Sequence, residues 1–329
     1  RIHSNAGGAS KLKAKYEITP LQALTKRWGD KVKITYTRGY GSYTPTFEGV
    51  IPSPYNADSL KNEALKVAAN ADVVLFFGGL NKNRHQDNEG FDRQSYDLPY
   101  GQPELLIELA KINKNIVFII ASGTATALPF EKDIPTIVQG WYGGSEAGNA
   151  IVSVLSGEVN PSGKLPFSYP KKLEDCGAHA FGEIAYPGIK NDQKYMEDIL
   201  VGYRWLDTKK IKPLYAFGYG MSYTTFKYGK ATTDRKEYTV ADTATLTFTL
   251  TNTGEREGAE IAQVYISQPK ASVKLQAGET KTVKIQLPVK EWAFYSETSQ
   301  SWVVEPGEFV ISLGASSDDI KHKCVVTIK

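Results

Sequence analysis

VVLFFGG, residues 73–79, is the stretch that decides the fold class of this chain. It is an almost continuous apolar run that ends in glycine, as expected for a strand whose two faces are both covered. NIVFIIASG (115–123) and IPTIVQGW (134–141) repeat the pattern further along the chain. Because buried apolar strands that alternate with helices pair in parallel, these runs predict a mainly parallel sheet.

Amphipathic helical patterns separate these strands. From Asp58, interpreted as the residue that caps a helix, apolar residues recur at helical spacing as far as Ala71. GQPELLIELAKI (101–112) repeats the pattern with Pro103 near its start, and SEAGNAIVSVLSG (145–157) predicts another helix. The sequence therefore predicts an α/β fold, a mainly parallel sheet with helices on both faces.

Two shorter stretches of this region are interpreted locally. VKITYT (32–37) alternates apolar and polar residues, which predicts a further strand. GGSEAG (143–148) is similar to the nucleophile motif G-x-S-x-G, but Ala147 takes the place of the second glycine. Ser145 is therefore interpreted as a helix N-cap and not as a nucleophile.

The last hundred residues or so change period. ATLTFTLT (244–251) alternates strictly, and shorter alternating runs separated by turn residues follow it. This pattern predicts an antiparallel β-sandwich. We expect an α/β domain over residues 1–170, an ordered connector rich in Tyr, Gly and Pro over 171–231 that packs on the first domain, and the β-sandwich over 232–329.

Composition excludes several classes of function. Lys and Arg number 39 against 36 Asp and Glu, which leaves no basic surface for nucleic acid and no polybasic segment for a membrane. No apolar run reaches the roughly 18 residues that span a bilayer. The 2 cysteines and 4 histidines lack metal-ligand spacing, and glycine-rich phosphate-binding motifs are absent. We therefore expect no cofactor and no metal, and a nucleotide-dependent enzyme is disfavoured.

HQDNEGFDR (85–93) follows the first strand and is the candidate functional stretch. Ligands of open parallel sheets bind beyond the carboxyl ends of the strands. A carboxylic acid there can act as a general acid when partial burial raises its pKa toward the working pH. Glu89 has this place, Gly90 lets the backbone approach a ligand, and Asp92 and Arg93 can pin the loop. On composition alone, a solvated polar loop is the simpler explanation.

Other side chains near the predicted strand ends are weaker candidates. Trp141 and Tyr142 follow the third strand and would suit a sugar-stacking platform, although burial at the strand end is the simpler explanation. His85 stands inside the candidate stretch, unlike the other histidines, which are interpreted as surface or loop residues.

A series of longer motifs resembles the C-terminal half of glycoside hydrolase family 3, whose members include β-glucosidases, β-xylosidases and exo-β-glucanases. The resemblance covers nearly the whole chain, because the α/β sandwich of this family is commonly followed by a fibronectin type III-like domain. ITPLQAL (18–24) fits the start of that α/β sandwich. The motifs, in family order, are NEGFDRQSYDLP (88–99), IVFIIASGTATALP (116–129), IVQGWYGGSEAGNAIVSVLSGEVNPSGKLPFSYP (137–170), ILVGYRWLDT (199–208) and PLYAFGYGMSYTTF (213–226).

This resemblance assigns roles to the candidate stretch. Many family members carry the acid/base glutamate in an E-G-[FY]-D-R loop, which implies that Glu89 is that catalytic residue. Asp87 becomes the neighbour that modulates it, and Asp92 and Arg93 match the residues that anchor the loop. His85 is kept as a possible substrate-binding or supporting residue. The implied activity is retaining, exo-acting hydrolysis of terminal β-linked sugars, with glucose first and xylose second.

The resemblance also implies a missing partner. In this family the aspartate nucleophile and most sugar-holding groups belong to an N-terminal (β/α)-barrel, and no barrel pattern precedes or follows the motifs here. Retaining cleavage needs two carboxyl groups roughly 5 Å apart, so the chain alone is expected to be inactive. The alternative is a non-catalytic carbohydrate-binding or adhesion module. A periplasmic or secreted location is expected from the family alone, and the sugar, the linkage and the oligomeric state stay open.

Overall fold

The computed structural model describes residues 6–42, 44–45, 50–51, 53–90, 92–268, 271–276, 281–296 and 299–329. The chain divides into two compact units, residues 1–159 and 160–329. The expected connector, residues 171–231, falls within the second unit. Its expected packing on the α/β domain, and the boundaries at 170 and 231, stay predictions.

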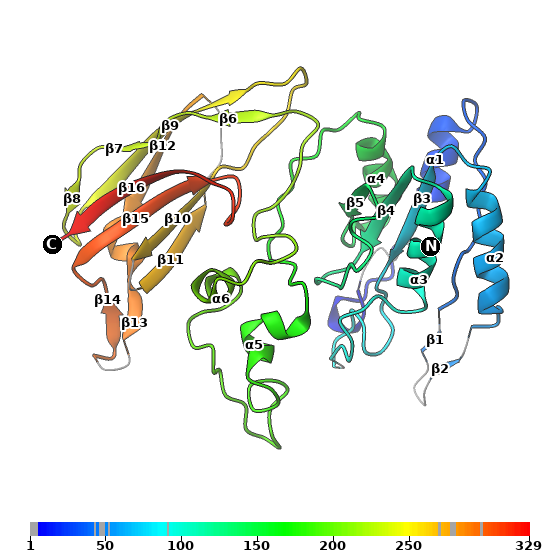
Figure 1. Cartoon of the computed structure of the whole chain (residues 1–329), viewed down its shortest axis with the longest axis horizontal. Helices are drawn as coiled ribbons and strands as arrows, with labels where there is room; N and C mark the ends of the chain where they lie inside the picture. The colour runs from blue at the N-terminus through cyan, green and yellow to red at the C-terminus, as the bar shows by residue number, and fades with distance from the viewer. Residues whose placement is uncertain are drawn as a thin grey trace. The chain divides into compact units, whose positions relative to one another are not determined.

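The first unit is built on a parallel sheet. β3 (Val74–Gly79), β4 (Ile116–Ala121) and β5 (Thr136–Gln139) lie in this order, with β4 in the centre (Figure 1). Val74 pairs with Ile116, and Val117 pairs with Thr136. The α/β class and the parallel pairing predicted from the apolar runs are confirmed.

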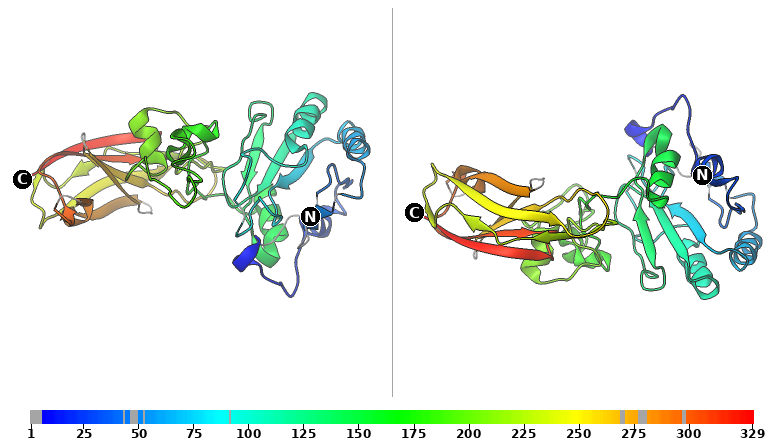
Figure 2. Two further views of the ribbon diagram at one scale, coloured as in Figure 1. Left: turned by 90° about the horizontal axis from the view of Figure 1, so that it is seen from below. Right: turned by 90° about the horizontal axis from the view of Figure 1, so that it is seen from above.

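Helices cover both faces of this sheet (Figure 2). On one face Ala23, Leu24 and Val152 form a buried cluster against Leu75 and Phe77 of β3. On the other face Gly78 of β3 lies against the Gln102 side chain. The first face is covered by α1 (Pro20–Trp28) and α4 (Ala147–Leu155), the second by α3 (Gln102–Ile112), with α2 (Ala57–Ala68) packed beside α3. The shorter elements of this unit are a 3₁₀ turn at Gly8–Ser10, β1 (Thr44–Pro45), β2 (Val50–Ile51) and a 3₁₀ turn at Gly144–Glu146.

Two predicted helix caps are wrong by one or two residues. Asn56, not Asp58, caps α2, because its side-chain oxygen accepts the Ser59 N–H at 2.9 Å. Ser145 lies inside the 3₁₀ turn before α4, whose N-cap is Glu146. The Ser145 carbonyl accepts the Ile18 N–H at 2.8 Å, so the residue joins the turn to the start of α1.

The strand predicted over 32–37 is also wrong, since this stretch is irregular. Ile34 packs against the cluster beneath α1 and α4, but Val32 and Tyr36 are 52% and 58% exposed. The alternation of apolar and polar residues over 32–37 therefore reflects one partly buried apolar side chain in an irregular segment. A strand needs a hydrogen-bonded neighbouring strand as well as this alternation.

The second unit contains the predicted antiparallel sandwich. Its two sheets have the orders β11-β10-β15-β16-β8 and β12-β9-β6, with β7 also on β9. Leu246 and Phe248 of β9 and Val264, Ile311 and Leu313 from the facing sheet are buried in its core. The strands are β6 (Phe226–Tyr228), β7 (Thr232–Thr233), β8 (Glu237–Tyr238), β9 (Thr243–Asn252), β10 (Gln263–Gln268), β11 (Ala271–Gln276), β12 (Lys281–Pro288), β15 (Gly307–Gly314) and β16 (Ile320–Ile328). A 3₁₀ turn at Val289–Trp292 and the hairpin of β13 (Phe294–Ser296) and β14 (Ser301–Val303) complete the unit.

The residues between the sheet domain and the sandwich are ordered by aromatic contacts. Tyr203, at the start of α6 (Tyr203–Lys209), lies 4.7 Å from Phe217 and 6.0 Å from Tyr265 of β10, measured between ring centroids. The buried Gln263 amide donates to the Gly218 carbonyl at 3.0 Å. These contacts tie the segment to the sandwich. A 3₁₀ turn at Leu173–Asp175 and α5 (Gly177–Ala180) precede it.

Candidate active site

The candidate site lies at the edge of the parallel sheet where its strands end. The loop over residues 80–101 leaves β3 and enters α3, and the loops after β4 and β5 begin at the same edge. The three loops meet there because parallel strands end on the same side of a sheet. Gly79 ends β3 with φ +122°, and a Cβ on it would lie 2.1 Å from the Ala121 oxygen. Only glycine fits this turn.

A polar network closes the base of this long loop. Gln102 is fully buried, and its side chain bonds both the N–H and the carbonyl of Gly79, at 2.7 and 2.9 Å, and the Pro99 carbonyl at 2.9 Å. The Tyr100 hydroxyl accepts side-chain amide donors from Asn83 at 2.9 Å and Gln86 at 2.6 Å. The two ends of the loop are thus held together from within the fold.

Asp87 fastens this loop to the two neighbouring ones. Its carboxylate accepts the Gly123 N–H at 2.7 Å, the Tyr142 hydroxyl at 2.6 Å and, more weakly, the Thr124 hydroxyl at 3.4 Å. Burial, followed by the hydrogen bond to Asp87 and its negative charge, raises the pKa of Tyr142 far above its usual value. Tyr142 therefore keeps its proton and acts as a donor at any ordinary pH.

Arg93 holds the far side of the loop. Its guanidinium donates to the Thr124 hydroxyl at 2.9 Å, to the Ala125 carbonyl at 2.7 Å, and to the carbonyls of Ser95 and Tyr96, each at 3.1 Å. These bonds link Arg93 to the start of the loop after β4, and the anchoring role expected for it stays a prediction. Asp92 contributes through its backbone, because its carbonyl lies 3.0 Å from Nδ1 of His85, while its side chain is exposed.

Glu89 differs from Asp87 and Arg93 in the exposure of its side chain. Its side chain is exposed at the sheet edge and not buried in the core. Its Oε2 accepts the backbone N–H of Ala9 from the N-terminal segment. Among the carboxylates of the loop, Asp87 accepts bonds from both neighbouring loops, whereas Glu89 is exposed and accepts its bond from Ala9. Phe91, between them and Arg93, lies outside the described residues.

Several residues of this arrangement were not predicted as parts of the site. Gly123 and Thr124 come from the loop after β4, and Gly7 and Ala9 from the N-terminal segment. The sequence predicts a stacking or buried ring at Tyr142, and does not reveal that its hydroxyl bonds Asp87. The paired glycines at 7 and 8 were the available signal, since such pairs often mark a close approach of two backbones.

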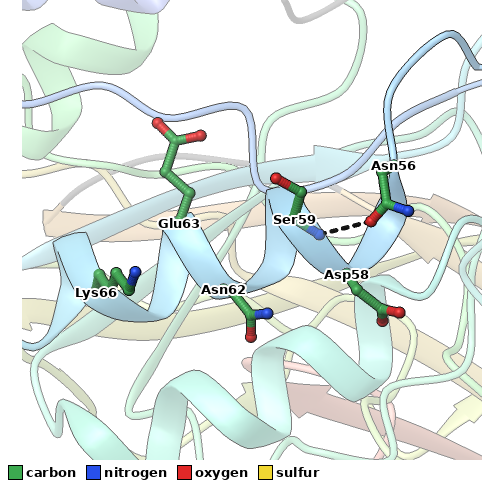
Figure 3. A pocket seen from close by; sticks show the side chains of 6 residues that line it. All are labelled: Asn56, Asp58, Ser59, Asn62, Glu63 and Lys66. Atoms are coloured by element: carbon green, nitrogen blue, oxygen red, sulfur yellow. Dashed lines mark hydrogen bonds between the residues drawn. The ribbon is translucent and has the colours of Figure 1, made fainter.

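A separate hollow lies along α2 and is lined by that helix and its N-cap alone (Figure 3). Asn56 is engaged there in capping the helix through the Ser59 N–H. No residue of the 80–101 loop lines the hollow, so it adds nothing to the site at the sheet edge. The lining residues are Asn56, Asp58, Ser59, Asn62, Glu63 and Lys66.

Among the described residues, no group of three or more His, Cys, Asp or Glu side chains could hold a metal ion. No described helix is long and apolar enough to cross a membrane.

The parallel-sheet unit and the antiparallel sandwich match, in this order, two domains that belong to one class of glycosidases. Residues 3–223 match the glycosyl hydrolase family 3 C-terminal domain, and residues 260–317 match the fibronectin type III-like domain. The chain belongs to glycosyl hydrolase family 3, and the resemblance drawn from its motifs is confirmed.

The chain is similar to several named glycosidases and to a solved structure. Beta-glucosidase BoGH3A of Bacteroides ovatus is 48% identical over an alignment of 330 positions, gaps included, that covers 96% of this chain and 44% of that protein. An exo-alpha-(1->6)-L-arabinopyranosidase of Bifidobacterium longum is 38% identical over 284 residues, 82% of this chain and 36% of that protein. The crystal structure of a Bifidobacterium adolescentis GH3 beta-glucosidase matches with a TM-score of 0.83 and 33% identity, covering 98% of this chain and 47% of that one. The chain thus spans less than half the length of each of these relatives.

Proposed function

We propose that this chain is the acid/base-bearing part of a retaining, exo-acting β-glycosidase, with Glu89 as the general acid and base. The observation that carries the proposal is the outward carboxyl group of Glu89 at the edge of the parallel sheet, on a loop held by Asp87 and Arg93. The family membership and the β-glucosidase relatives support the reaction class.

The chemistry requires a second carboxylate. Retaining hydrolysis needs a nucleophile about 5 Å from the acid/base residue. Among the described residues of the loop, Asp87 accepts several hydrogen bonds and is committed to the structure. We therefore expect the nucleophile to come from an aspartate outside this chain, on the barrel that the family resemblance implies, and we expect the chain alone to be inactive.

The test is a leaving-group comparison in the longer protein that carries both parts. Glu89→Ala should cut kcat/KM on alkyl glucosides and cellobiose by about 10³-fold or more, because these leaving groups need a proton. It should spare 2,4-dinitrophenyl glucoside much more, and added azide should restore turnover on that substrate as the glycosyl azide. The matched control is Glu104→Gln, which removes an exposed carboxylate in the first turn of α3 and should leave the leaving-group pattern unchanged. Equal losses of Glu89→Ala on both substrates, or no azide product, would exclude the acid/base role.

For the substrate we propose two sugars in order of preference, whereas for the reaction we propose one mechanism. We propose terminal β-linked glucose as the first substrate and xylose as the second. One relative is named an arabinopyranosidase, so a family match leaves room for other sugars. A panel of nitrophenyl glycosides with the longer protein decides between them, and a higher kcat/KM for any sugar but glucose would correct the first choice.

The cellular location is also a proposal. We propose the periplasm or the extracellular space, where oligosaccharides from external polysaccharides are met. Cell fractionation with an antibody against this chain tests it, and recovery from the cytoplasm alone would refute it.

A further inference from the structure

The N-terminal segment Gly7–Ala9 lies directly against the candidate acid/base residue. Gly7 donates its backbone N–H to the Asp87 carbonyl at 2.9 Å. Two residues later, Ala9 donates its backbone N–H to Oε2 of Glu89. The segment is therefore bonded both to the main chain of the loop and to the carboxylate that the loop presents.

Both glycines are needed for this approach. A Cβ on Gly7 would lie 2.3 Å from Oδ1 of Asn88, and a Cβ on Gly8 would lie 2.1 Å from Cβ of Glu89. Gly8 also has φ +70°, a conformation that residues with a side chain rarely adopt. Close packing, backbone conformation and hydrogen bonding thus all place this segment against Asn88 and Glu89.

We propose that Gly7–Ala9 is the positioning element of Glu89 and selects the oxygen that carries its catalytic proton. The inference rests on the proposed role of Glu89. A backbone N–H can only donate, and the carbonyl-type oxygen of a carboxyl group is its better acceptor. With Oε2 held by Ala9, the proton belongs on Oε1.

The two steps of the reaction then use the same oxygen. Oε1–H gives its proton to the glycosidic oxygen as the bond from that oxygen to the anomeric carbon breaks and a carboxylate from outside this chain bonds the same carbon. In the second step Oε1 takes a proton from water, the water oxygen bonds the anomeric carbon, and the carboxylate leaves. Oε2 stays on the Ala9 N–H throughout, so the carboxyl group does not turn between the steps.

The first experiment uses the 329-residue chain itself and needs no activity. In protein labelled with ¹⁵N-alanine, the Ala9 amide is assigned by its absence in Ala9→Gly and followed with pH. Its proton resonance should move when Glu89 ionises, and this movement should vanish in Glu89→Gln but persist in Asp92→Asn. An Ala9 amide that does not respond, or still responds in Glu89→Gln, would overturn the proposal.

The second experiment uses the longer protein and the leaving-group ratio, which a purely structural role would not move. Ala9→Pro removes the donor, and Gly8→Ala keeps it but displaces Glu89. Each should raise the ratio of kcat/KM on dinitrophenyl glucoside to that on cellobiose by about tenfold, the usual order for losing a hydrogen bond to a charged group. Lys13→Pro, at an exposed position four residues after Ala9, is the matched control and should leave the ratio within about twofold.

A failure of the positioning role of Gly7–Ala9 can be distinguished from a failure of the acid/base role of Glu89. If folded Ala9→Pro and Gly8→Ala keep the parent ratio while Glu89→Ala changes it, the positioning role is wrong and the acid/base role stands. If Glu89→Ala itself leaves the ratio unchanged, the proposed function is wrong, and the positioning role falls with it. Melting temperatures close to that of the parent are required before a ratio is interpreted.

Discussion

Removing the Tyr142 hydroxyl should destabilise the first unit by an amount that depends on pH. In Tyr142→Phe, Asp87 loses a 2.6 Å hydrogen bond but keeps the bonds from Gly123 and Thr124. A hydrogen bond to a charged group contributes about 1.5–3 kcal/mol, and because the ring is only partly buried we expect about 1.5 kcal/mol at pH 7.

The pH dependence follows from the raised pKa of Tyr142. A raised pKa means that the stabilisation is fully present below the unfolded value, about 10, and declines as pH rises above it. Above that pH the unfolded parent loses a proton that the folded parent keeps. The advantage of the parent over Tyr142→Phe should therefore shrink by at most about 1.4 kcal/mol per pH unit.

Urea unfolding read by hydrogen-exchange mass spectrometry of peptides from residues 1–159 measures this unit separately. Tyr36→Phe is the matched control, since Tyr36 is 58% exposed in the same unit, and it should change stability by less than about 0.5 kcal/mol. Equal effects of the two substitutions at pH 7, or a difference that stays constant from pH 8 to 11, would refute the reasoning.

Three further outcomes are expected. Arg93→Lys should cost the first unit about 2 kcal/mol and speed proteolysis within residues 80–101, because an ammonium group cannot replace the forked contacts with Thr124 and Ala125. Phe248→Ala should cost the sandwich about 3–5 kcal/mol, seen as a lower melting transition, since Phe248 is 1% exposed. Calorimetric titration of the chain alone with cello-oligosaccharides should show no binding at millimolar concentration; binding would favour a carbohydrate-binding module.

The sheet could be predicted from the sequence because a strand that is buried on both faces appears as a continuous apolar run. The runs that became β3 and β4 are apolar at nearly every position, whichever face a side chain occupies. α1 was not predicted as a helix, although Thr19 caps it and Pro20 begins it. Its buried residues, Pro20, Ala23 and Leu24, form a stripe too short to show a clear period.

The site was predictable only where it is local in sequence. Glu89, Asp87 and Arg93 lie within one short motif, so a family resemblance could mark them together. Their partners are distant in sequence: Tyr142 is 55 residues from Asp87, and Ala9 is 80 residues from Glu89. Such contacts depend on which loops the parallel topology brings to one edge, and no spacing rule along the chain encodes them.

The side chain of Gln102 bonds both ends of the 80–101 loop, so the loop is a structural unit that is closed at its base. Hydrogen bonds among Gly79, Pro99 and Gln102 join the two ends of the loop. The entropic cost of closing the loop is therefore offset at its base, without contacts from residues further out. Length and composition beyond this base can therefore change with little effect on the sheet, provided that Asp87 and Arg93 keep their bonds to the neighbouring loops. Transplanting the corresponding loop of a relative between Gly79 and Gln102 offers a route to new catalytic surroundings on an unaltered scaffold.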